Sequence, residues 1–139
     1  MKRILGIIAA AVIFVAVPAH AQNTEQVAKA QAAAQSWLAL TDSKAYAQSW
    51  EQSAALFQAG MSKPSWVSAI QGARSPLGSL KSRTVKSASF TRSLPGAPEG
   101  EYVVIQYETQ FEHKAGAIET VTPLREKDGS WKVSGYFIK

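Results

Sequence analysis

The chain has 139 residues, a formal net charge of +5 and no cysteine. A chain of this length forms one domain with a single core, and the lack of cysteine excludes disulfides, thiol chemistry and cysteine-ligated metals. The charge is too small and too interspersed with acidic residues for a nucleic-acid-binding surface, so we expect no nucleic-acid partner.

The first 21 residues have the three regions of a secretory signal peptide. Lys2 and Arg3 are positively charged, the run from Ile4 to Val17 is apolar, and Ala19-His20-Ala21 carries small residues at the two positions that signal peptidase reads. The apolar run is shorter than the roughly 20 residues of a membrane-spanning helix. We therefore expect export, with no stable membrane anchor after cleavage.

Cleavage is expected between Ala21 and Gln22, which leaves one mature domain over residues 22–139. The mature net charge is then +3, since Lys2 and Arg3 are removed from a total of +5. The expected location is periplasmic or secreted.

Three helices are predicted in the first part of the mature chain. The first starts at Asn23 or Thr24 and carries apolar residues, among them Trp37 and Leu38, at a 3.6-residue period. It ends at Thr41-Asp42-Ser43, where Asp42 is expected to cap the next helix, with a place near the pocket as the alternative. The second helix is predicted from Tyr46 to Gly60.

Ser62 and Pro64 open the third helix, because serine caps helix N-termini and proline fits their first turn. This helix is expected to end near Arg74, since Pro76 disfavours helical geometry at the residue before it.

Strands follow the third helix. An irregular strand is predicted over residues 77–93, then a Pro/Gly loop and an alternating strand over residues 101–113. Asp128-Gly129 predicts a two-residue type I′ hairpin turn, and Ala115-Gly116 gives a weaker signal of the same kind.

These two turns together predict one apolar and one polar face of an antiparallel sheet. The face towards the helices would carry Val103, Ile105, Tyr107, Phe111, Ile118, Leu124, Trp131, Val133 and Phe137. The opposite face would carry Gln106, Glu108, Gln110, Glu112, Glu119, Arg125 and Lys132.

The second face also has apolar members, namely Tyr102, Val104, Val121, Tyr136 and Ile138. Such a patch often marks a protein contact, and a homodimer is its simplest form. The alternative is that the segment 77–93 covers it.

The order of elements predicts the α+β class, with three N-terminal helices packed on a four-stranded antiparallel sheet. This order resembles the nuclear transport factor 2-like (cystatin-like) cone, in which a curved sheet and helices enclose a pocket.

Several stretches resemble a bacterial exported family called domain of unknown function 4019. They are "AAAQSWLALTDSKAYAQSWEQSAALFQ", "RSPLGSLKSR", "SLPGAPEGEYVVIQYETQF" and "ETVTPLREKDGSWKVSGYFIK". The resemblance implies a single-domain envelope protein. It supplies no activity, cofactor or catalytic residue.

Four residues are candidates for a ligand pocket. Arg74 and Arg83 flank a Ser-Pro turn and either form a fork for an anion or only connect a helix to the sheet. Tyr107 and His113 are expected on the helix-facing side of the sheet, where His113 could act as a base or lie at the rim in water.

The sequence predicts no catalytic residues, metal site or cofactor, because Glu108, Glu112 and Glu119 are all expected on the outward face. We therefore expect a non-catalytic module that binds a small apolar or anionic ligand, or a partner protein. The alternative is an isomerase- or hydrolase-like enzyme with a site inside the cone.

Overall fold

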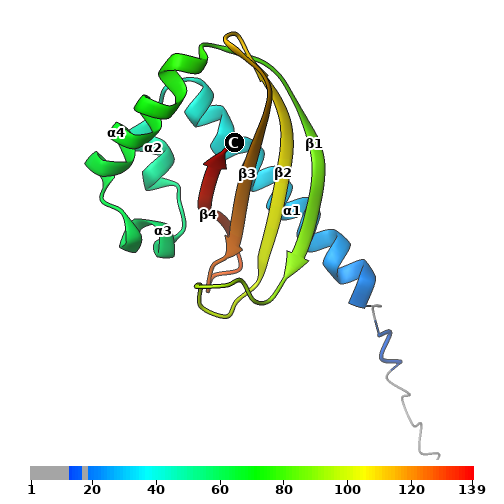
Figure 1. Cartoon of the computed structure of the whole chain (residues 1–139). Coiled ribbons are helices and arrows are strands. Elements are labelled where there is room, and N and C mark those ends of the chain that lie inside the picture. Colours follow the sequence, from blue (N-terminus) through cyan, green and yellow to red (C-terminus); the bar gives the residue numbers. More distant parts are fainter. Residues whose placement is uncertain (1–12, 17–18) are drawn as a thin grey trace, which may run out of the picture.

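The computed structural model describes residues 13–16 and 19–139, and it shows helices packed against one curved sheet (Figure 1). The elements are α1 (Ala19–Asp42), α2 (Tyr46–Glu51), α3 (Ala55–Gly60), α4 (Lys63–Arg74), the short 3₁₀ helix η1 (Ser75–Leu77), β1 (Leu80–Thr91), β2 (Tyr102–Phe111), β3 (Lys114–Arg125) and β4 (Trp131–Ile138). The predicted α+β class is confirmed, with helices first and a four-stranded antiparallel sheet after them.

The predicted signal sequence falls largely on residues 1–12 and 17–18, which lie outside the described residues. The predicted cleavage point between Ala21 and Gln22 lies near the start of α1. The buried residues of this helix begin further on, at Ala30. The packed part of the domain therefore lies within the predicted mature chain.

The predicted second helix is wrong in one respect, because it is two short helices, α2 and α3. Between them, Ala54 donates its backbone N–H to the carbonyl oxygen of Val133 in β4, at 2.8 Å. The hydroxyl of Ser53 accepts a hydrogen bond from the Trp37 indole at 3.0 Å. The segment 52–54 leaves helical geometry to make these contacts with the sheet edge and the core.

The third predicted helix is confirmed as α4. Ser62 is its N-cap, and the Ser62 hydroxyl accepts from the backbone N–H of Ser65 at 3.3 Å. The helix ends at Arg74, and η1 carries the Ser-Pro dipeptide that stops it. This end places Arg74 beside the end of α1.

The strands are ordered β1-β2-β3-β4 in a meander, so β1 and β4 are the two edges of the sheet. Helix α1 crosses one face and contacts all four strands. Figure 1 shows α2, α3 and α4 gathered on the β4 side of the molecule, with β1 at the far edge. One half of the sheet is thus covered by several helices, and the other half mainly by α1.

The turn between β2 and β3 lies at Glu112-His113, and the predicted turn at Ala115-Gly116 is wrong. Thr109 pairs with Ala117, and Phe111 pairs with Lys114. Gly116 lies inside β3 with a φ of 74°, next to an irregularity in the register. The register therefore differs from the predicted one by an odd number of residues, which turns every β3 side chain to the opposite face.

This register reverses the predicted faces of β3. Four residues of β3 are buried towards the helices, namely Ala117, Glu119, Val121 and Pro123. Ile118 and Leu124, which were predicted on the helix-facing side, lie on the open side instead. The most consequential correction is Glu119, because it brings a carboxylate into the core.

The turn between β3 and β4 is also different from the prediction. Gly129, with a φ of 88°, donates to the carbonyl of Glu126, and Arg125 pairs with Trp131. A type I′ turn needs positive φ at both central residues, and Lys44 is the only described residue other than glycine with positive φ. The loop is therefore the three residues Lys127-Asp128-Gly129.

An irregularity between Thr122 and Pro123 then restores the predicted pairing of Thr120 with Phe137. Trp131 and Val133 are buried as predicted, but past the irregularity Phe137 points outward and is 61% exposed. Tyr136 packs against the core in its place.

The predicted apolar patch on the second face does not form as a set. Val121 and Tyr136 belong to the core side. Tyr102 is buried, and its hydroxyl donates to the carbonyl of Pro98 at 2.6 Å. The alternative covering by the segment 77–93 is wrong as well, because β1 pairs edge to edge with β2.

Aromatic rings fill the core between α1, α4 and the β4 side of the sheet. Trp37 lies 5.8 Å from Trp66 and 5.3 Å from Tyr136 between ring centroids. Phe57 meets Trp66 edge to face at 4.9 Å. Pairs of this geometry contribute about 0.5–1.5 kcal/mol each beyond their burial. This cluster anchors the helices over β4.

Candidate functional site

An ionic cluster of Asp42, Arg74, Arg83 and Glu119 joins the end of α1, the end of α4, β1 and β3. Arg83 is its centre. Its guanidinium donates to both carboxylate oxygens of Asp42, at 2.8 and 3.0 Å, and to both of Glu119, at 2.7 and 3.2 Å. This double fork is the geometry that arginine adopts with carboxylates.

Arg74 brings a second positive charge to Asp42. Its Nη2 donates to Asp42 Oδ1 at 2.8 Å, and its Nη1 donates to the Thr41 hydroxyl at 3.1 Å. The guanidinium also lies over the ring of Phe111, at 4.8 Å from the centroid. Asp42 does not cap α2 as predicted, because the N-cap of that helix is Ala45 and no side chain caps it. Both Asp42 oxygens accept from arginines instead.

Glu119 is fully buried, and its carboxylate accepts from three side chains. Besides Arg83, the Thr109 hydroxyl donates to Oε1 at 2.6 Å, and the Tyr136 hydroxyl donates to Oε2. A buried charge is tolerated when it is paired and hydrogen-bonded in this way. These donors keep the Glu119 oxygens occupied inside the protein.

The pKa shifts agree with this pairing. Burial alone would raise the pKa of Asp42, but the hydrogen bonds from Arg83 and Arg74 outweigh it and hold that pKa below its ordinary 3.8. Burial lowers the pKa of Arg83, and the two carboxylates more than reverse this effect. Burial and the adjacent Glu119 charge raise the pKa of Tyr136. Two positive and two negative charges balance within the cluster.

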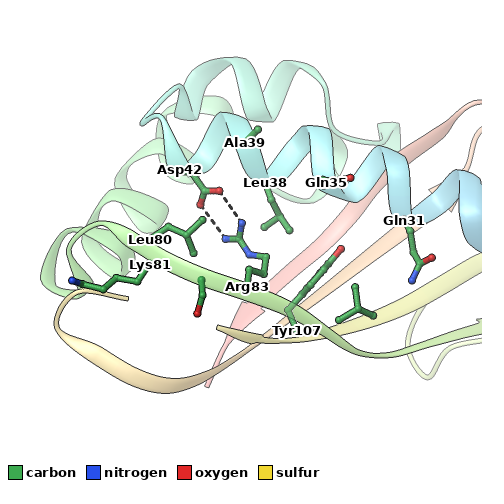
Figure 2. Close-up of a pocket in the computed structure, with 11 residues that line it drawn as sticks. Gln31, Gln35, Leu38, Ala39, Asp42, Leu80, Lys81, Arg83 and Tyr107 are labelled. Atoms are coloured by element: carbon green, nitrogen blue, oxygen red, sulfur yellow. Dashed lines mark hydrogen bonds and ion pairs between the residues drawn. The ribbon is translucent and has the colours of Figure 1, made fainter. Parts of the chain in front are cut away.

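Next to the ionic cluster lies an open groove of about 620 Å³ between α1 and β1, which we call the α1–β1 groove. Its volume lies in the range of small-molecule sites. It is lined by Gln31, Gln35, Leu38, Ala39, Asp42, Leu80, Lys81, Ser82, Arg83, Val85 and Tyr107. Figure 2 shows Tyr107 rising from the sheet towards α1, with Arg83 reaching up to Asp42 beside it.

The hydroxyl of Tyr107 is one of the polar groups of the sheet that line the groove, beside those of Lys81, Ser82 and Arg83. Among the described residues no protein group hydrogen-bonds it, although the residue is only 5% exposed. Burial raises the pKa of Tyr107 to about 12, with Arg83 lowering it and Glu119 raising it further. The phenol is therefore neutral near pH 7 and can both donate and accept.

The four predicted site residues are only partly brought together. Arg74 and Arg83 meet at Asp42, and Tyr107 lines the groove next to Arg83. His113 instead lies in the β2–β3 turn, where its side chain is 61% exposed and its Nε2 lies 3.4 Å from Oε1 of Glu112. Tyr107 and His113 were predicted on the same face of the sheet, and they do not lie together. The exposed position of His113 fits the alternative, in which it lies at the rim in water.

Two further features bound the chemistry of the described part of the chain. It contains no group of three or more histidine, aspartate or glutamate residues placed to hold a metal ion. It also contains no helix long and apolar enough to cross a bilayer.

A family model called "Protein of unknown function (DUF4019)" matches residues 33–136, which includes all four cluster residues and Tyr107. The chain belongs to the DUF4019 family. No curated protein and no solved structure matches it. The matched span starts within α1 and ends in β4, so the family relation covers the helices over the sheet as well as the sheet itself.

Proposed function

We propose that this DUF4019 protein is an exported, non-catalytic binding module whose site is the α1–β1 groove. The observation that carries the proposal is the Tyr107 hydroxyl, which lies at the groove without a hydrogen-bond partner among the described residues. Gln31 and Gln35 add side-chain amides that no described protein group hydrogen-bonds, and Leu80 and Val85 add apolar surface. Apolar walls with a few converging polar groups are typical of ligand sites.

The charges at the groove favour binding over catalysis. Asp42 is the carboxylate that lines the groove, and two arginines hold its pKa low, so it is a weak base near neutral pH. Glu119 is enclosed by its three donors. His113 lies in a turn away from the groove lining. We therefore place no catalytic residue at the groove.

We further propose that the fold is a nuclear transport factor 2-like cone. The order of helices before a four-stranded meander supports this, as does α1 lying across the curved sheet (Figure 1). A solved structure of this chain that superposes on such cones would test it.

Export to the periplasm or beyond is supported by the charged, apolar and small-residue regions of the N-terminus. Mass spectrometry of the protein from the periplasmic fraction is expected to give an N-terminus at Gln22. A full-length chain recovered from the inner membrane would contradict export.

Native mass spectrometry of the protein purified from its own periplasm tests the binding function. We expect a bound species that is lost in Tyr107→Phe, which removes one hydroxyl and keeps the ring. Tyr46→Phe is the matched control, because Tyr46 is partly exposed and lies outside the groove. A bound species retained by both variants, or none in the unmodified protein, would overturn the proposal.

A further inference from the structure

The rest of the chain covers the two edges of the sheet to different extents. The β4 edge is partly covered, because Ala54 donates to Val133 and α3 packs on this strand. The β1 edge has β2 on one side, and in the described part of the chain no element pairs with its other side. An unpaired edge strand presents a row of free backbone donors and acceptors.

The α1–β1 groove runs along this free edge. Its lining includes the consecutive residues 80–83 of β1 on one side and Gln31, Gln35 and Ala39 of α1 on the other. An extended segment placed there would pair with β1 through its backbone. Every second side chain of that segment would point into the groove.

The charges of β1 favour a negatively charged segment. β1 carries Lys81, Arg83 and Lys86 and no acidic residue. Arg83 is neutralised by the ionic cluster, but Lys81 and Lys86 are exposed and form no ion pair with described residues. Both lysines lie at irregularities of the β1–β2 register. Lysine at an edge irregularity guards against unwanted strand pairing.

These lysines also disfavour one register in which a second copy of this chain could be the occupant. Antiparallel pairing of two β1 strands about the point between Arg83 and Thr84 would set Lys81 opposite Lys86 twice. Like charges directly opposite each other destabilise a strand pair. The acidic side chains of a different strand would instead form ion pairs with the same two lysines.

We propose that the α1–β1 groove takes an extended, acidic peptide segment of a partner protein, which pairs with β1 as an added strand. Its apolar side chains enter the groove against Leu80 and Val85, and its acidic side chains lie near Lys81 and Lys86. This rests on the proposed function and names the class of ligand for that site.

The test uses a fluorescent synthetic peptide of about eight residues, a common strand length, in which valine alternates with glutamate. Fluorescence anisotropy with the mature domain is expected to show saturable binding. The same peptide with every backbone nitrogen methylated has no N–H to donate from either edge and cannot pair as a strand, so its affinity should fall at least about tenfold. Equal affinity of the two peptides would overturn strand addition.

A charge reversal tests the role of the two lysines. Lys81→Glu with Lys86→Glu is expected to weaken peptide binding about tenfold, since each exposed ion pair contributes a few tenths to about 1 kcal/mol. Lys127→Glu with Lys139→Glu makes the same change in net charge at exposed positions outside β1. Equal weakening by both double variants would mean that only the overall charge matters, and would overturn the proposal.

The outcomes separate this inference from the function on which it rests. Absence of peptide binding overturns the peptide-strand proposal, whether or not another molecule occupies the groove. If a small molecule then co-purifies and depends on the Tyr107 hydroxyl, the groove is still a binding site.

Discussion

The two flanks of α1 are built from different chemistry. On the β4 flank, Trp37, Trp66 and Tyr136 pack together under several helices. The indoles there already have partners, since Trp37 donates to Ser49 and Ser53, and Trp131 donates to Gln26. On the β1 flank, the ionic cluster replaces the aromatic rings, and the Tyr107 hydroxyl lacks a partner among the described residues.

Under the proposed function, this difference separates the part of the domain that gives stability from the part that binds. The β4 flank also has a surface depression, of about 360 Å³, but its floor includes tryptophans whose N–H groups are used internally. The ionic cluster lets the β1 flank keep α1 in place with few covering side chains. A groove beside the free strand edge is the consequence.

The largest loss of stability is expected from substitutions on the β4 flank. Val133 is 1% exposed, so Val133→Asp buries an unpaired charge and is expected to destabilise the fold by more than about 4 kcal/mol. Phe137→Asp is the neighbouring control, because that side chain is 61% exposed, and its cost should stay below about 1 kcal/mol. Denaturant unfolding measures both. Similar losses would show that β4 lacks the irregularity that turns Phe137 outward.

Next in size is the loss of the buried carboxylate. Glu119→Ala leaves Arg83, Thr109 and Tyr136 with unmade hydrogen bonds, and removal of one partner of a buried ion pair costs about 3–5 kcal/mol. The exposed Glu108 of β2 forms no ion pair with any described residue, so Glu108→Ala should change stability by less than about 0.5 kcal/mol. A small effect of Glu119→Ala in denaturant unfolding would place its carboxylate outside the core.

Glu119 also shows what the sequence could and could not predict. The helix N-cap at Ser62, the helix end at Arg74 and the inward side of β2 follow from local signals and are correct. The inward side of β3 depends on where one turn lies, and Gly116 was taken for a turn when it marks an irregularity inside the strand. An error of an odd number of residues there moved Glu119 to the wrong face.

The ionic cluster was missed for the same reason. Arg74 and Arg83 were candidates, but their carboxylate partners come from the end of α1 and from β3, far away in the sequence. A usable signal was the run Ala117, Glu119, Val121, where alternate residues place a single acid between two apolar neighbours. The groove itself has no local signal, because it depends on which half of the sheet the helices leave uncovered.

Removing the hydroxyl from either of the two tyrosines beside Glu119 is expected to have a smaller effect on stability. The two losses should differ in size. Tyr136→Phe removes a hydrogen bond to a charged group and is expected to cost about 1.5–3 kcal/mol. Tyr107→Phe removes a hydroxyl with no described protein partner, so its stability should stay within about 0.5 kcal/mol. Thermal or denaturant unfolding of the ligand-free domain measures both, and equal costs would contradict the idea that the Tyr107 hydroxyl is reserved for a ligand.

The smallest expected effect is a pH dependence of the unfolding free energy that comes from Asp42. Its pKa in the folded state lies below the ordinary value of 3.8, so the unfolded state binds the proton first as the pH falls. The contribution is fully present above about pH 5 and is lost as the pH falls through the folded pKa. In acid unfolding, Asp42→Asn should flatten the loss of stability below about pH 4. Glu99→Gln, at an exposed loop position, is the control variant.

The most direct test of the open β1 flank is a nitrogen-15 NMR titration of residues 22–139 with a small-molecule extract of the cells that produce the protein. The side-chain amides of Gln31 and Gln35 report on the α1–β1 groove, and the indole N–H groups of Trp37 and Trp131 report on the other flank. We expect the glutamine amides and the β1 backbone to shift while the indoles stay in place. Shifts confined to the indoles, or none on either flank, would contradict the account.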